Sequence, residues 1–139
     1  MARGTQYLTE DHLWGPRDDY KGPYYTSAQC HFASEIGYHG CPSPESIRRF
    51  ITPGNEWPYT ANKEWLLHAT SPIPGVNLLD YRVELMANQV RVLFGEAPDN
   101  LDDFAFASQC SQAEAMKFFV EMFRSRKWRR TGKIGRAHV

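Results

Sequence analysis

The stretch from Gln29 to Gly40 constrains the fold of this chain more than any other. Small and apolar residues run through Phe32-Ala33, a carboxylate follows at Glu35, and glycines then interrupt the pattern. This order is typical of a buried strand, here near residues 30–36, that ends in an acid and turns toward a helix. Loops that leave the carboxyl ends of parallel strands converge on one face of an α/β protein. The sequence therefore predicts an α/β fold with Glu35 at a functional edge.

Helices are predicted after this strand. Ser43, followed by a proline and an acid, is an N-cap that predicts a short helix to about Ile51. Three more are expected over residues 61–68, 77–94 and 100–126, with N-caps at Asn77 and Asn100 and a stop at Gly95. Their expected core residues are Leu79, Met86, Val90 and Leu93 in one helix, and Phe104, Ala115, Phe118, Phe119 and Met122 in the last.

Residues 1–28 are rich in glycine, proline, tyrosine and charge, and they show no sustained hydrophobic period. This pattern predicts a long irregular segment. Such stretches are uncommon inside a complete compact domain unless they are functional or their packing partners are missing. The interpretation favoured here is that the chain is part of a larger domain.

Composition limits the class of protein. With 139 residues, 42% of them hydrophobic, the chain has material for one ordinary core. Sixteen basic residues balance sixteen acidic ones, so no overall field favours nucleic acid or an anionic membrane, and no apolar run is long enough for a spanning helix. Three cysteines and no signal peptide after Met1 favour a reducing compartment such as the cytoplasm. The oligomeric state stays open.

A metal site is not expected. Cys30-His31 and His39-x-Cys41 offer two thiolates and two imidazoles, but the strand between them would hold the pairs about 25 Å apart. Glu10-Asp11 and Asp18-Asp19 suit metal or sugar ligation, and such pairs are also common on solvated loops.

Two further features have structural explanations. Cys110 lies in a predicted helix with no base nearby in sequence, so packing is the expected role of its thiol. The basic run from Arg124 to Arg130 suits the C-terminal end of a helix, where cations are favoured.

Four short motifs follow one another along the chain: Asp11-His12-Leu13-Trp14-Gly15-Pro16-Arg17, Phe32-Ala33-Ser34-Glu35-Ile36-Gly37-Tyr38, Pro42-Ser43-Pro44-Glu45-Ser46-Ile47 and Ser111-Gln112-Ala113-Glu114-Ala115. Together they resemble the catalytic domain of family-two glycoside hydrolases, in the β-mannosidase-like branch, over nearly all of residues 8–132. The resemblance implies a partial TIM (β/α)8 barrel over residues 1–132. It would be a mostly helical fragment around barrel strand 7, truncated before strand 8.

The resemblance also implies an activity. Such enzymes are retaining exo-β-glycosidases that hydrolyse terminal β-linked sugars by double displacement. The family's nucleophile is the glutamate of a Ser-Glu-(Phe/Ile)-Gly motif, and that glutamate corresponds to Glu35 here. Trp14 and His12, in the motif that precedes this strand, are the expected substrate-binding residues. The implied partner is carbohydrate, with no cofactor, metal, nucleic acid or membrane.

The chain departs from the family's pattern at the second catalytic carboxyl. In the family, the acid/base glutamate follows an asparagine and precedes the nucleophile, whereas the pair Asn55-Glu56 comes after Glu35. That pair lies in a Pro- and Gly-rich loop, and we interpret it as a decoy. The chain alone is therefore expected to be inactive, and to fold poorly because its barrel strand would have unpaired edges.

The last seven residues, 133–139, continue no pattern and resemble the translation of a sequencing adapter, so they are expected to be a non-native tail. The alternative to an enzyme fragment is a non-catalytic helical module that docks a partner through its aromatic N-terminal loop. A complete module of that kind should have balanced amphipathic helices and a finished C-terminus.

Overall fold

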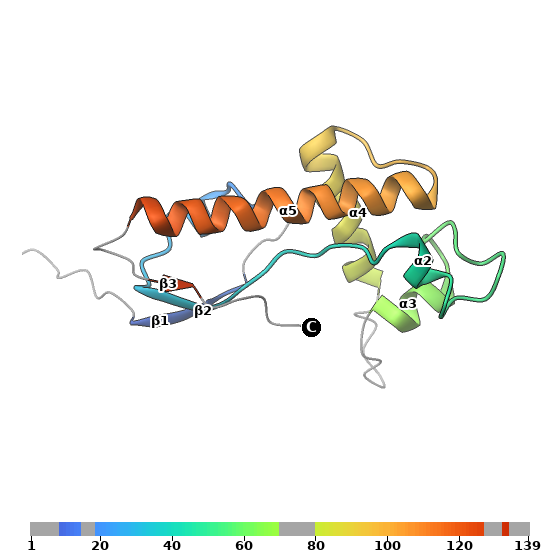
Figure 1. Ribbon diagram of the computed structural model, residues 1–139, viewed down its shortest axis with the longest axis horizontal. Coiled ribbons are helices and arrows are strands. Elements are labelled where there is room, and N and C mark those ends of the chain that lie inside the picture. The colour runs from blue at the N-terminus through green and yellow to red at the C-terminus, as the bar shows by residue number, and fades with distance from the viewer. Residues whose placement is uncertain (1–8, 15–18, 70–79, 127–131, 134–139) are drawn as a thin grey trace, which may run out of the picture. The chain divides into compact units, whose positions relative to one another are not determined.

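The protein is described by a computed structural model over residues 9–14, 19–69, 80–126 and 132–133 (Figure 1). The fold is mixed α/β and divides into two compact units, residues 1–38 with 114–139 and residues 39–113. The elements in chain order are β1 (Glu10–Leu13), α1 (Pro23–Thr26), β2 (Phe32–Ile36), α2 (Pro44–Ile47), α3 (Lys63–Ala69), α4 (Asp80–Phe94), α5 (Leu101–Ser125) and β3 (Gly132–Lys133). None of the helices in these ranges is long and apolar enough to cross a membrane.

The first unit contains a parallel sheet in the order β1-β2-β3. The strand predicted near residues 30–36 is confirmed as β2, and it is the central strand. The expectation that this strand has unpaired edges is wrong on the β1 side, which is paired from Phe32 to Ile36, and wrong in part on the other side, where β3 pairs with Phe32 and Ala33. β3 forms where no strand was expected, and its second residue, Lys133, belongs to the predicted tail.

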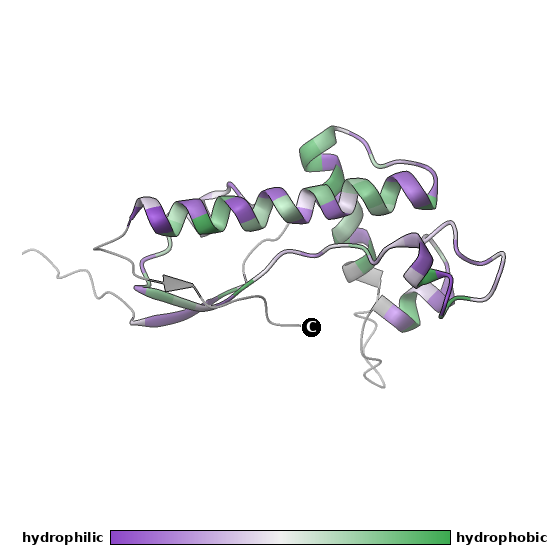
Figure 2. Ribbon diagram, in the orientation of Figure 1, coloured by the Kyte–Doolittle hydropathy of each residue, from purple (hydrophilic) through white to green (hydrophobic). Residues whose placement is uncertain are grey.

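The prediction of an irregular segment over residues 1–28 is wrong at residues 10–13 and 23–26, which form β1 and α1, while residues 1–8 and 15–18 lie outside the described ranges. β1 has only four residues and only Leu13 among them is buried, so it carries no hydrophobic alternation. Figure 2 shows the largely hydrophilic β1 beside the more hydrophobic β2. Backbone pairing with a strand some twenty residues away holds β1 in place, and a local pattern does not record such pairing.

The C-terminal part of α5 covers one face of this sheet (Figure 1). The buried residues of the cluster are Leu13, Tyr20, Tyr25, Cys30, Ala33, Ile36, Tyr38, Ala115, Phe119, Met122 and Phe123. Phe119 is fully buried and its ring centroid lies 4.8 Å from that of Tyr25. The predicted core face of the last helix is confirmed here, although Phe118 is only partly buried. Two tyrosines of the N-terminal segment are therefore core residues.

The second unit consists of α2, α3, α4 and the first part of α5, and its helix ends follow the predicted signals. The Ser43 hydroxyl accepts a hydrogen bond from the Ser46 N–H, and the Asn100 side chain accepts one from the Asp103 N–H at 3.0 Å. Gly95 has φ +89° and its N–H donates to the Arg91 carbonyl, so it ends α4 as predicted. Asn77 and Leu79 lie outside the described residues.

The helix bounds differ modestly from those predicted. α2 ends at Ile47, and turns continue the chain to residue 51; α3 begins at Lys63. The core of this unit includes aromatic residues of the loop before α3. Phe104 is fully buried, with its ring centroid 5.2 Å from those of Tyr59 and Trp57. Met86 and Val90 are buried as expected, whereas Leu93 is only partly buried.

Candidate active site

A break in strand register places the candidate residues beside one another. Asp11 pairs with Ala33, but the next residue, His12, pairs with Glu35, so Ser34 is an extra residue in β2. Ala33 and Ile36 are both fully buried although they are three residues apart, which a regular strand would not allow. The bulge at Ser34 reconciles them, and it turns Glu35 toward the face opposite the core.

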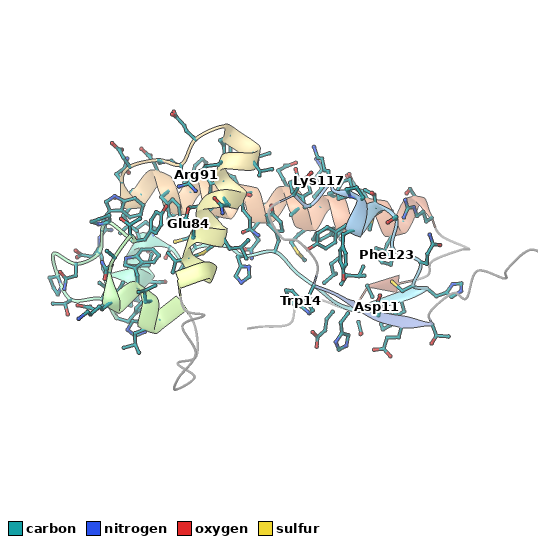
Figure 3. The ribbon with its side chains drawn as sticks, turned by 180° about the vertical axis from the view of Figure 1, so that it is seen from behind. Asp11, Trp14, Glu84, Arg91, Lys117 and Phe123 are labelled. Atoms are coloured by element: carbon teal, nitrogen blue, oxygen red, sulfur yellow. The ribbon has the colours of Figure 1, made fainter. Side chains whose placement is uncertain are left out.

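Two residues lie against the carboxylate of Glu35: His12 of β1, and Trp14, the first residue after β1. The Trp14 indole Nε1–H donates a 2.7 Å hydrogen bond to Glu35 Oε2. His12 Nδ1 lies 3.7 Å from the same oxygen, close enough for attraction when the imidazole is protonated and too far for a hydrogen bond. Figure 3 shows Trp14 just past the end of β1, while Phe123 lies between α5 and the sheet.

The two carboxylate oxygens of Glu35 differ in their surroundings. Both recorded contacts reach Oε2, and no residue in the described ranges donates a hydrogen bond to Oε1. The side chain of Glu35 is 39% exposed and that of His12 is 57% exposed. A partly exposed carboxylate with one oxygen oriented by a donor can act as a nucleophile or as a general base.

The three residues that the sequence nominates, Glu35, Trp14 and His12, are thus brought together. The role of Trp14 was not foreseen. Sequence reasoning proposed it as a sugar-contacting ring, and the structure adds a hydrogen bond from its indole to the carboxylate. Residues at the carboxyl ends of neighbouring parallel strands converge, but β1 has no strand pattern of its own, so the sequence held no signal for this contact.

Other nominated carboxylates have other partners. Asp11 Oδ1 accepts a hydrogen bond from the His12 N–H at 2.8 Å. Glu56 belongs to the second unit, and its Oε2 accepts a hydrogen bond from the Gly54 N–H at 2.7 Å. Asn55 donates from its side chain to Glu64 at 2.7 Å. Contacts with their own loop and with α3 therefore account for the Asn55-Glu56 pair.

The second unit has a polar cluster that sequence reasoning missed. Arg91 Nη1 lies 2.7 Å from Glu84 Oε1 and 2.6 Å from Asn88 Oδ1, and its Nη2 lies 3.4 Å from the Tyr59 hydroxyl. Figure 3 shows Glu84 and Arg91 on α4. Burial raises the pKa of Tyr59, with the Glu84 carboxylate adding to the effect. The spacing of these α4 residues, on one side of a helix, was the available signal.

Metal ligands do not gather in the part of the chain that can be described. There, no group of three or more His, Cys, Asp or Glu side chains is placed to hold a metal ion. Cys30 is buried in the first unit and Cys41 in the second, and all three cysteines are free thiols.

Cys41 is expected to resist alkylation in the folded protein. Burial raises the pKa of its thiol to about 12 from 9.0, so about a thousandfold less thiolate is present at neutral pH. Iodoacetamide should therefore modify the partly buried Cys110 first, as followed by peptide mass spectrometry. In urea, Cys41 should be modified at an ordinary rate. Rapid labelling of native Cys41 would contradict its burial.

No family model, no curated protein and no solved structure matches this chain.

Proposed function

We propose that the chain is part of a retaining exo-β-glycosidase, similar to family-two glycoside hydrolases of the β-mannosidase-like branch, with Glu35 as its nucleophile. The observation that carries the proposal is the position of Glu35. It stands at the carboxyl end of the central parallel strand, with Oε2 bound by Trp14 and the side chain 39% exposed. This is where barrel enzymes carry catalytic side chains.

The layout of the first unit supports a barrel origin for the sheet. Its three strands are parallel, and both described helices of the unit pack their apolar residues into one cluster with Ala33 and Ile36. Glu35 lies on the opposite face. In a (β/α)8 barrel, helices cover the outside while active-site residues project from the strand ends inside. The partial barrel, centred on its seventh strand, is the architecture that we propose.

The proposed chemistry uses the two oxygens of Glu35 differently. Oε1 attacks the anomeric carbon of a terminal β-linked sugar and forms a glycosyl ester, while the bond to the leaving oxygen breaks. A second carboxyl, about 5 Å away, protonates that oxygen and then removes a proton from the water that hydrolyses the ester. Trp14 keeps Oε2 in place throughout by donating its indole N–H to that oxygen.

We propose that the second carboxyl lies outside this sequence. The resemblance assigns it to an asparagine-glutamate pair before the nucleophile, and no such pair precedes Glu35. Glu56 is engaged by the Gly54 N–H, which supports the view that it is a decoy. The 139-residue chain alone is therefore expected not to turn over glycosides.

Trapping of the covalent intermediate tests this function. The full-length enzyme that contains this sequence is treated with an activated 2-deoxy-2-fluoro-β-mannoside, which slows breakdown of the glycosyl ester. Digestion and mass spectrometry should place the sugar on Glu35. A sugar attached to another carboxylate would overturn the assignment. Turnover of an aryl β-mannoside by the 139-residue chain, abolished by Glu35→Gln, would overturn the proposal that the second carboxyl lies outside this sequence.

The alternative of a helical docking module is less well supported by the side chains of the N-terminal segment. Tyr20 and Tyr25 are buried in the core of the first unit, and Tyr24 is 42% exposed. An aromatic docking surface requires several such rings in solvent.

A further inference from the structure

We propose that Gly37 is a positioning residue for Glu35, because the absence of a side chain there makes room for the Trp14 indole. The inference rests on the proposed role of Glu35 as the nucleophile. It concerns how one oxygen of that carboxylate is kept in place, and it assigns a specific task to the glycine two residues beyond the acid.

The contact between Gly37 and Trp14 is close. A Cβ atom added to Gly37 would lie 2.6 Å from Trp14 Cη2 and 3.0 Å from Cζ3. Carbon atoms in contact prefer separations of about 3.5–4.0 Å, so any side chain at residue 37 would displace the ring. The six-membered ring of the indole thus occupies the space beside the backbone at the end of β2.

The other end of the same ring system binds Glu35. Nε1 of Trp14 donates to Oε2 at 2.7 Å, and the indole is rigid, so its two ends cannot move independently. A ring pushed away from Gly37 carries Nε1 with it. A displacement of about 1 Å takes a 2.7 Å hydrogen bond beyond its useful range. An alanine at residue 37 would therefore release the carboxylate without touching it.

Backbone conformation does not explain the glycine. Gly54 and Gly95 have positive φ angles of 91° and 89°, whereas Gly37 does not belong to the glycines with positive φ. An L-residue can adopt the backbone of residue 37, and the restriction comes from the neighbouring ring. The need for glycine at residue 37 therefore comes from the Trp14 ring and not from a turn that requires a positive φ angle.

Indole NMR of the 139-residue chain tests the coupling. Trp14→Phe identifies the Trp14 indole N–H peak in a ¹⁵N-labelled sample. Glu35→Gln should shift this peak in the wild-type background and leave it unmoved in the Gly37→Ala background. Gly54→Ala is the control for strain at another glycine: its φ of 91° makes alanine unfavourable there, but the added Cβ meets nothing within 4 Å, so the Trp14 peak should stay in place. The proposal is overturned if Glu35→Gln leaves the Trp14 indole peak unmoved in the wild-type background. It is also overturned if Glu35→Gln shifts that peak equally in the wild-type and Gly37→Ala backgrounds.

A suppression experiment covers the case in which Gly37→Ala unfolds the chain. Phenylalanine at residue 14 lacks the second ring that contacts Gly37, so Gly37→Ala should lower the melting midpoint in the Trp14 background and leave it nearly unchanged in the Trp14→Phe background. Equal losses in the two backgrounds would show that the glycine serves the backbone.

These outcomes are separable from the proposed function. Failure of the NMR and suppression tests overturns the role of Gly37, whichever residue the fluorosugar labels. Failure of trapping on Glu35, with the indole coupling intact, overturns the glycosidase proposal and leaves the coupling as a structural fact.

Discussion

Replacing Glu35 with glutamine in the full-length enzyme should lower turnover of an aryl β-mannoside by about 10⁴-fold or more. The neutral amide cannot form the glycosyl ester, although it keeps nearly the same shape beside Trp14. The loss should appear in kcat with both activated and unactivated leaving groups, because ester formation is blocked in each case.

Glu10→Gln is the matched control for this experiment. Glu10 is an exposed carboxylate at the start of β1 in the same sheet, and its replacement should leave turnover nearly unchanged. Azide gives a second diagnostic. With Glu35→Ala, the small anion should enter the vacated position and yield an α-linked glycosyl azide. Full activity of Glu35→Gln, or a β-linked azide product, would contradict a nucleophilic role.

The largest effect on stability is expected from Phe119→Ala. Phe119 is fully buried in the apolar cluster of the first unit and lies against Tyr25 and Phe118, so truncation leaves a cavity beside these rings. Removing a buried phenylalanine typically lowers the free energy of unfolding by about 3–5 kcal/mol. Since domains of this size have about 5–15 kcal/mol in total, this single change should remove a substantial part of the stability of the first unit.

Urea titration followed by circular dichroism measures this change. Val120→Ala is the control: it is the next residue of α5, its side chain is 41% exposed, and its effect should lie within about 0.5 kcal/mol. Equal midpoints for the two variants would show that the apolar cluster of the first unit contributes little to stability.

Much of the helical structure could be predicted from local signals. Ser43, Gly95 and Asn100 mark helix ends with side chains or backbone angles that act within a few residues, and the structure has them in those roles. Phe104 and Phe119 follow the helical period of α5 and are buried. These features depend on neighbours in sequence, which is why they were visible there.

The sheet depends on contacts between distant residues, so it was predicted only in part. β2 is apolar enough to be recognised, whereas β1 is polar and short and owes its strand conformation to pairing. Glu35 could be nominated from the sequence because the acid lies at the end of β2, the strand whose own residues reveal it. Its hydrogen bond to Trp14, a residue 21 positions away, depends on the register between two strands and could not be predicted.

The extra residue at Ser34 has a consequence for how this sequence can vary. Side chains of a strand alternate between two sides, so in a regular strand that kept Ser34, Glu35 would share the side of the buried Ala33 and lie against the apolar cluster. A chain without Ser34 would restore plain alternation, with the acid directly after Ala33 and again on the side away from the cluster. A one-residue deletion at this point should therefore be tolerated if the bulge disappears with it, whereas the extra residue without a bulge would enclose the carboxylate in hydrocarbon.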